Sequence, residues 1–285
     1  MAETKKRKLD ILVLSDIHLG TYGCHAKELL HYLKTVKPKT VILNGDIIDI
    51  WQFSKRYWPK SHMKVVKHIM GWMSKGVKIY YITGNHDEML RKFVGFKMGS
   101  LRIVNKVVLE LDNGKKAWFF HGDVFDVTMQ HSKWLAKLGA VGYDTLILIN
   151  RVANFISEKI FKRGKLSLSK KIKNTVKSAV KFINSFEQTA ADIGISKQYD
   201  YVVCGHIHQP EMREVENDHG KIMYLNSGDW IENLTALEYV NSEWKIYRFD
   251  ETAIQQMKTA AVEEEELDNS TLFDNMVEEF NLMRN

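Results

Sequence analysis

The stretch LDILVLSDIH, residues 9–18, decides the fold. Its first seven residues form an almost continuous apolar run, which is typical of a strand buried on both faces of a parallel sheet. Two polar side chains, Asp16 and His18, follow at once. The run is too short for a membrane-spanning helix and is interrupted by Asp16, so we expect a first strand and not a signal peptide.

The neighbouring segments repeat this design. Buried strands are expected at 41–44 (VILN) and 78–83 (KIYYIT), and helical periodicity covers 26–36 and 62–75. This β-α-β-α-β rhythm predicts an α/β fold with a parallel sheet and right-handed crossovers.

The second half is expected to return to strands around a helical insertion. Asn113-Gly114 is a turn dipeptide that suits a hairpin, and 128–193 shows helical patterns without a strand signal. The strands expected in this half are 107–111, 116–121, 201–204, 222–225, 234–240 and 243–249. The last three are expected to form a meander.

Composition limits the class of protein. The chain has 285 residues, 45% of them hydrophobic, which excludes a disordered chain and suffices for one large α/β domain or two small ones. Two cysteines are too few for a disulfide framework, so we expect a reducing, cytoplasmic location. The formal charge of +6 combines a basic block at 126–197 with an acidic end at 251–285. We expect a domain over 1–250 that contains the insertion, followed by an acidic helical tail.

Polar residues follow five of the expected strands where each strand ends. They are Ser15-Asp16-Ile17-His18, Asn44-Gly45-Asp46, Gly84-Asn85-His86-Asp87, His121-Gly122-Asp123 and Gly205-His206-Ile207-His208. Because the carboxyl ends of parallel strands line the ligand crevice of an α/β sheet, we expect these side chains to meet. In an extended segment, alternate residues such as His206 and His208 point the same way, so both can reach one centre.

Seven of these side chains are candidate metal ligands. They are Asp16, His18, Asp46, Asn85, His121, His206 and His208. They exceed the four ligands of a tetrahedral zinc site and suit two divalent cations bridged by one carboxylate, with Mn, Fe or Zn compatible. Such a pair polarises a phosphoryl group and activates water, which predicts phosphoester hydrolysis by in-line attack of a metal-bridging hydroxide.

The five motifs, in this order, resemble those of the calcineurin-like metallophosphoesterase superfamily. The resemblance implies a β-sandwich core flanked by helices, with Mn as the expected metal. The implied ligands are Asp16, His18, Asp46 and His208 for one metal, and Asp46, Asn85, His121 and His206 for the other. It also implies that His86 stabilises the transition state or protonates the leaving oxygen, and we expect Asn85 and His86 to stabilise charge on the non-bridging oxygens. Asp87 would orient His86, and Asp123 is a candidate partner of a ligand.

Longer stretches resemble the UDP-2,3-diacylglucosamine pyrophosphatase (diphosphatase) family over roughly residues 9–249. They are LSDIHLGTYGCHAKELL, GDIIDIWQF and NSGDWIENLTALEY, together with the helical insertion after HGDVFD. The resemblance implies that 126–197 is a helical lid over the site and that the substrate is a lipid-linked nucleotide sugar of lipid A biosynthesis. It further implies a peripheral protein on the cytoplasmic face of the inner membrane. The apolar stretch 134–161 suits a lipid or, equally, simple packing onto the sheet.

Two features depart from the best-characterised branch of that family. That branch has Arg at the position of His86. The lid of that branch carries a Ser, an Asn and a Lys at fixed spacing that hold the substrate. Asn174 and Lys177 of this chain match the Asn and Lys and are candidate substrate residues, whereas Ser169 lies one residue away from the position of the Ser.

Two alternatives stay open at this point. A nuclease or cyclic-nucleotide phosphodiesterase could use the same site, and the basic block suits nucleic acid in charge. A non-catalytic metal-binding scaffold could bind a partner through its acidic tail. The apolar residues of that tail recur at helical spacing, which suits a packed helix or a homodimer contact.

Overall fold

The computed structural model describes residues 6–50, 57–125, 183, 186–250 and 252. The chain divides into two units, Met1–Tyr247 and Arg248–Asn285, and the fold reported below is that of the first unit. Most of the expected lid and nearly all of the expected acidic tail lie outside the described residues. So do Ser169, Asn174 and Lys177.

One sheet has seven strands in the order β12-β11-β1-β2-β3-β5-β4. Its strands are β1 (Arg7–Leu14), β2 (Val36–Asn44), β3 (Lys78–Ile82), β4 (Lys97–Met98), β5 (Leu101–Val104), β11 (Thr235–Val240) and β12 (Glu243–Arg248). β1, β2, β3 and β5 are parallel neighbours, whereas β11 joins β1 antiparallel. The apolar run after residue 9 therefore forms a central strand, and the predicted parallel arrangement is confirmed.

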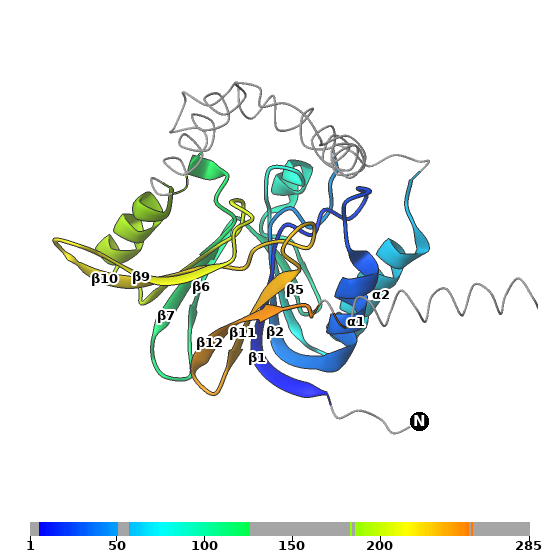
Figure 1. Cartoon of the computed structure of the whole chain (residues 1–285), viewed down its shortest axis with the longest axis horizontal. Coiled ribbons are helices and arrows are strands. Elements are labelled where there is room, and N and C mark those ends of the chain that lie inside the picture. The colour runs from blue at the N-terminus through cyan, green and yellow to red at the C-terminus, as the bar shows by residue number, and fades with distance from the viewer. Residues whose placement is uncertain (1–5, 51–56, 126–182, 184–185, 251, 253–285) are drawn as a thin grey trace, which may run out of the picture. The chain divides into compact units, whose positions relative to one another are not determined.

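Two helices connect the first three strands and cover one face of this sheet (Figure 1). α1 (Ala26–Thr35) buries Leu29 and Leu33, and α2 (Lys60–Ser74) buries Val65 and Ile69. Their buried residues recur at helical spacing, so each helix presents one apolar stripe to the sheet. A 3₁₀ helix, η1 (Glu88–Phe93), follows β3.

The other sheet has five strands in the order β6-β7-β8-β10-β9. Its strands are β6 (Lys106–Glu110), β7 (Lys116–Phe120), β8 (Tyr201–Cys204), β9 (Glu211–Asn217) and β10 (Gly220–Asn226). β6 and β7 form the predicted hairpin, and β8 lies parallel to both β7 and β10. The expected meander is wrong, because β10 belongs to this sheet while β11 and β12 belong to the seven-stranded one.

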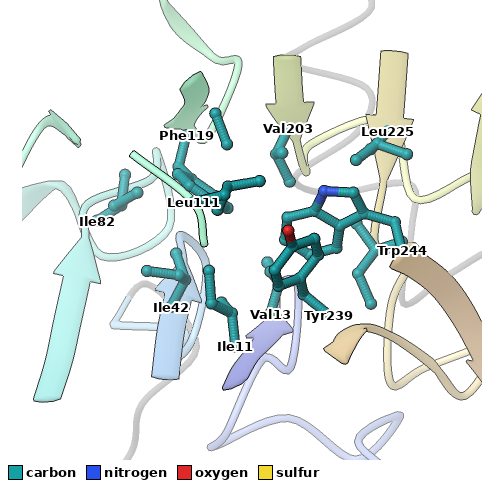
Figure 2. Packing of buried hydrophobic residues seen from close by; sticks show 12 residues of the cluster. Ile11, Val13, Ile42, Ile82, Leu111, Phe119, Val203, Leu225, Tyr239 and Trp244 are labelled. Carbon is teal, nitrogen blue, oxygen red and sulfur yellow. The ribbon is translucent and has the colours of Figure 1, made fainter. Parts of the chain in front are cut away.

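The two sheets face each other across a common hydrophobic core (Figure 2). Val13 and Ile42 come from the seven-stranded sheet, and Phe119, Val203 and Leu225 from the five-stranded sheet; all five are fully buried. Burial of large apolar side chains from both inner faces is the main contribution that holds the sandwich together.

Helical residues 186–196 cover the outer face of the five-stranded sheet. Phe186, Ala190 and Ile195 pack there against Trp118 and Tyr224. The predicted insertion included these residues, and the structure places them against the sheet. Helices thus flank both sheets of the sandwich (Figure 1), as the fold class predicted.

The strand ends that carry the polar motifs lie at one edge of the sandwich. The Asp16 amide donates to the Gly45 carbonyl at 3.1 Å, which joins the ends of β1 and β2. The Gly205 amide donates to the His121 carbonyl at 2.9 Å, which joins the ends of β8 and β7. Among the described residues, no helix combines the length and the apolar character needed to cross a membrane.

Candidate metal centre

The structure brings the seven predicted ligands together from five strand ends and both sheets. Asp16, His18 and His208 form one group, and Asp46, His121 and His206 form another; within each, the ligand atoms lie within 4.8 Å of one another. Asn85 joins the second group, with its Oδ1 3.3 Å from His121 Nε2. His18 and Asp46 also form a group with His86, so Asp46 is shared between two groups.

The backbone at these positions is strained. Nine non-glycine residues of the described chain have a positive φ, and five of them are predicted ligands. These five are Asp16 (51°), His18 (51°), Asp46 (53°), His206 (67°) and His208 (60°). Left-handed backbone at Asp or His costs free energy that tertiary contacts must offset, and such residues cluster at functional sites.

At two positions of the motifs, neighbouring side chains leave no room for any residue larger than glycine. A Cβ on Gly84 would lie 2.2 Å from Asp46 Oδ1, and a Cβ on Gly45 would lie 2.2 Å from His121 Nδ1. Gly45 also has a φ of +84°, which favours glycine. The glycines therefore let the backbone approach the ligand side chains closely.

Three imidazoles share one orientation. Nδ1 of His121 donates to the Asn44 carbonyl at 2.9 Å, whereas Nδ1 of His18 and of His208 each lie 3.4 Å from the carboxylates of Asp49 and Asp229. Because Nδ1 faces an acceptor oxygen in each case, Nδ1 donates outward and Nε2 is the ring atom turned toward the centre.

Those Nε2 atoms face carboxylate oxygens. His208 Nε2 lies 3.2 Å from Asp16 Oδ1, and His121 Nε2 lies 3.2 Å from Asp46 Oδ2. Nε2 of His18 is buried without a hydrogen-bond partner, and so is Asp16 Oδ1. A carboxylate that faces Nε2 calls for positive charge between the two, which a second ring proton or a bound cation supplies, so the donor set fits divalent cations.

The pKa values of these groups point the same way. Burial alone would lower the pKa of His208, but the carboxylates of Asp16 and Asp229 outweigh burial and raise it to about 10. Burial opposes ionisation of Asp46, yet the neighbouring His121 and His18 hold the pKa of that carboxyl far below its usual value. The centre therefore stabilises positive charge beside ionised carboxylates.

The carboxylate that orients His86 is Asp49. His86 Nδ1 lies 2.9 Å from Asp49 Oδ2, while the His86 amide donates to Asp46 Oδ1 at 2.8 Å. The predicted partner, Asp87, instead accepts hydrogen bonds from the Gly84 amide, the Ile47 amide and the Tyr81 hydroxyl. Asp49 thus contacts the His86 ring, whereas the hydrogen bonds of Asp87 join the ends of β2 and β3.

Sequence reasoning also missed Asp229. Its Oδ1 accepts three successive backbone amides, from Ile231, Glu232 and Asn233, which fixes its Oδ2 beside His208. Asp49 and Asp229 lie in the stretches GDIIDIWQF and NSGDWIENLTALEY, whose resemblance to a known family was the signal that could have marked them. Asp123, predicted to contact a ligand, forms a half-buried ion pair with Arg91 of η1.

The chain is similar to curated hydrolases and to a solved phosphodiesterase. A UDP-2,3-diacylglucosamine hydrolase of Blochmanniella pennsylvanica is 24% identical, covering 73% of this chain and 82% of its own length. A UDP-2,3-diacylglucosamine hydrolase of Aliivibrio fischeri is 23% identical, and the match covers 84% of this chain and 98% of that protein. A solved structure of an archaeal phosphodiesterase is 15% identical, covers 84% of this chain and 98% of its own, and has a TM-score of 0.40.

The family model of the calcineurin-like phosphoesterases matches residues 9–210. This range begins in β1 and extends past His208, so it contains all five motifs and the seven clustered side chains. The chain therefore belongs to the calcineurin-like phosphoesterase family, a family of metal-dependent phosphoester hydrolases.

Proposed function

We propose that the protein is a two-metal hydrolase that cleaves the pyrophosphate of UDP-2,3-diacylglucosamine or of a related lipid-linked nucleotide sugar. The observation that carries the hydrolase part is the pair of groups Asp16-His18-His208 and Asp46-His121-His206, with Asp46 also grouped with His18. Two divalent cations in these groups, with Mn as the first choice, would polarise the phosphoryl oxygens and lower the pKa of a water molecule.

The remaining groups of the site suit phosphoryl chemistry. Burial alone would lower the pKa of His86, but the hydrogen bond to Asp49 and the charge of Asp46 outweigh it and raise that pKa. A protonated His86, held at Nδ1, can donate from Nε2 to a phosphoryl or leaving oxygen. Asn85 places its Oδ1 beside His121, which leaves its amide NH₂ for a non-bridging oxygen.

A lipid-linked substrate is supported by the names of the relatives and by one surface of this chain. The segment after His86 exposes five large apolar side chains, Met89, Phe93, Val94, Phe96 and Met98. Lys92 and Lys97 are exposed among them. Exposed apolar side chains interleaved with lysines suit a lipid headgroup boundary, so we propose peripheral association with the cytoplasmic face of a membrane.

Steady-state hydrolysis by the full-length protein with Mn²⁺ tests this function. We expect turnover of UDP-2,3-diacylglucosamine in anionic vesicles, release of UMP, and loss of turnover in Asp46→Ala and His206→Ala. The matched controls are Asp218→Ala and His219→Ala, which change exposed residues of the β9–β10 turn and should retain activity.

Other outcomes would select a different function. Preferred cleavage of single-stranded DNA or of a cyclic nucleotide would replace the lipid substrate with the rival phosphodiesterase function. Absence of bound metal together with no turnover of any phosphodiester would identify a non-catalytic scaffold.

A further inference from the structure

Two tyrosine rings, Tyr22 and Tyr57, contact one another at a tilt beside the loop that carries His18. The ring centroids of Tyr22 and Tyr57 are 3.7 Å apart, with an interplanar angle of 34°. Tyr22 is 76% exposed, the largest value among the exposed large apolar side chains of the described residues. One ring face therefore rests on Tyr57 while most of the Tyr22 ring is open to a ligand.

The loop that carries Tyr22 is attached directly to a predicted ligand. Tyr22 is four residues after His18, and Thr21 donates to the His18 carbonyl from its amide at 3.2 Å and from its hydroxyl at 3.0 Å. The Asp49 amide donates to the Leu19 carbonyl at 2.9 Å. The loop that carries Tyr22 is thus fixed to His18 and to the loop that carries Asp49.

A buried histidine holds both sides of the pair in place. The Gly20 amide donates to His62 Nδ1 at 2.9 Å, and burial lowers the pKa of His62, which keeps it neutral and able to accept. Tyr57 and Trp58 pack edge-on against the His62 ring, at 6.0 and 5.8 Å between centroids. The platform is therefore preorganised, and binding a ligand requires little ordering.

We propose that the Tyr22–Tyr57 pair is a stacking site for the nucleobase of a nucleotide whose phosphate lies at the metal centre. An exposed, rigid aromatic face binds planar bases through stacking, and every base offers such a face. A base is separated from its α-phosphate by the ribose, so a phosphate at the metals places the base a short way outside the ligand side chains, and Tyr22 lies four residues after the ligand His18. This inference rests on the proposed function, because it assigns the nucleotide half of that substrate.

Calorimetric titration of the full-length protein with UMP and with ribose 5-phosphate tests the site. Both probes carry one phosphate on the same ribose, and only UMP carries a base. Stacking is worth about 1–3 kcal/mol per base, so UMP should bind on the order of 10-fold more tightly. Tyr22→Ala and Tyr57→Ala should remove this preference, and Tyr22→Trp should retain it. Val108→Ala, which trims an exposed apolar side chain of β6, should leave it unchanged.

Equal binding of the two probes by the parent protein, or an undiminished preference in Tyr22→Ala, would overturn the stacking site. Much tighter binding of a thymidine oligonucleotide than of UMP would show that the site serves nucleic acid and would overturn the nucleotide assignment. The two proposals fail separately. Tyr22-dependent UMP binding without hydrolysis removes only the proposed function, whereas hydrolysis without a base preference removes only the stacking site.

Discussion

Asp49 and Asp87 are both buried carboxylates of the site, and their hydrogen bonds separate two roles. Asp49 contacts the imidazoles of His86 and His18, so it positions side chains of the centre. Asp87 accepts from the Gly84 amide at 2.6 Å, the Ile47 amide at 3.1 Å and the Tyr81 hydroxyl at 2.7 Å, so it joins two loops.

Replacing each carboxylate by its amide should separate positioning from folding. Asp49→Asn should lower kcat for bis(p-nitrophenyl) phosphate by about 10- to 100-fold, because the imidazoles lose their charged acceptor. Asp87→Asn should lower the free energy of unfolding by about 1–3 kcal/mol, because the amide cannot accept all three donors. Urea denaturation and steady-state kinetics measure both variants. A larger loss of kcat in Asp87→Asn than in Asp49→Asn would support the prediction that Asp87 orients His86.

At the scale of elements, a glycine in the turn after β3 has no room for a side chain, whereas a glycine in α2 has room for one. Gly84 follows β3 against Asp46, whereas Gly71 lies inside α2 with no atom within 4 Å of its hypothetical Cβ. The same substitution should therefore harm the metal centre at one position and favour the helix at the other.

Gly84→Ala should lower Mn²⁺ affinity and kcat by at least about 10-fold, because the added methyl group displaces the shared carboxylate of Asp46. Gly71→Ala should raise the free energy of unfolding by about 0.5–1 kcal/mol through helix propensity and leave Mn²⁺ binding unchanged. Mn²⁺ titration followed calorimetrically, together with urea unfolding, distinguishes the two. Normal Mn²⁺ binding by Gly84→Ala would show that the turn accommodates the methyl group without displacing the Asp46 carboxylate.

At the scale of the whole molecule, one carboxylate links the two sheets at the end opposite the site. Asp112 follows β6, and its two oxygens accept from the Tyr239 hydroxyl of β11 at 2.5 Å and from the Ser242 hydroxyl at 3.0 Å. These hydrogen bonds hold the pKa of Asp112 below its usual value. A lowered folded-state pKa contributes stability above the unfolded pKa of about 3.9, and that stability is lost as the pH falls.

Asp112→Asn should therefore lower Tm near neutral pH, and its difference from the parent protein should shrink below about pH 4. Thermal unfolding followed by circular dichroism at both pH values measures this difference. Asp218→Asn, which changes an exposed carboxylate of the β9–β10 turn, is the control and should leave Tm unchanged. The same Tm difference at both pH values would show that ionisation of Asp112 has no part in the effect.

The strands that carry the ligand motifs could be predicted because their signals are local. β1, β2, β3, β7 and β8 each contain an apolar run, and a polar motif follows each run directly. β9 was missed because it is an edge strand in which Val215 alone is buried, so its alternation carries little apolar signal. β4 and β5 were missed because they are short and at most half-buried.

The sequence by itself determined which residue types could bind metal, their order along the chain and the α/β class. Only the tertiary structure decided which sheet each strand joins, since an apolar run indicates burial but does not name its partner. It also decided that Asp49 supports His86, 37 positions away, and that Tyr22 stacks on Tyr57. Such pairs depend on how loops from separate strands meet in space, and no local pattern in the chain encodes that meeting.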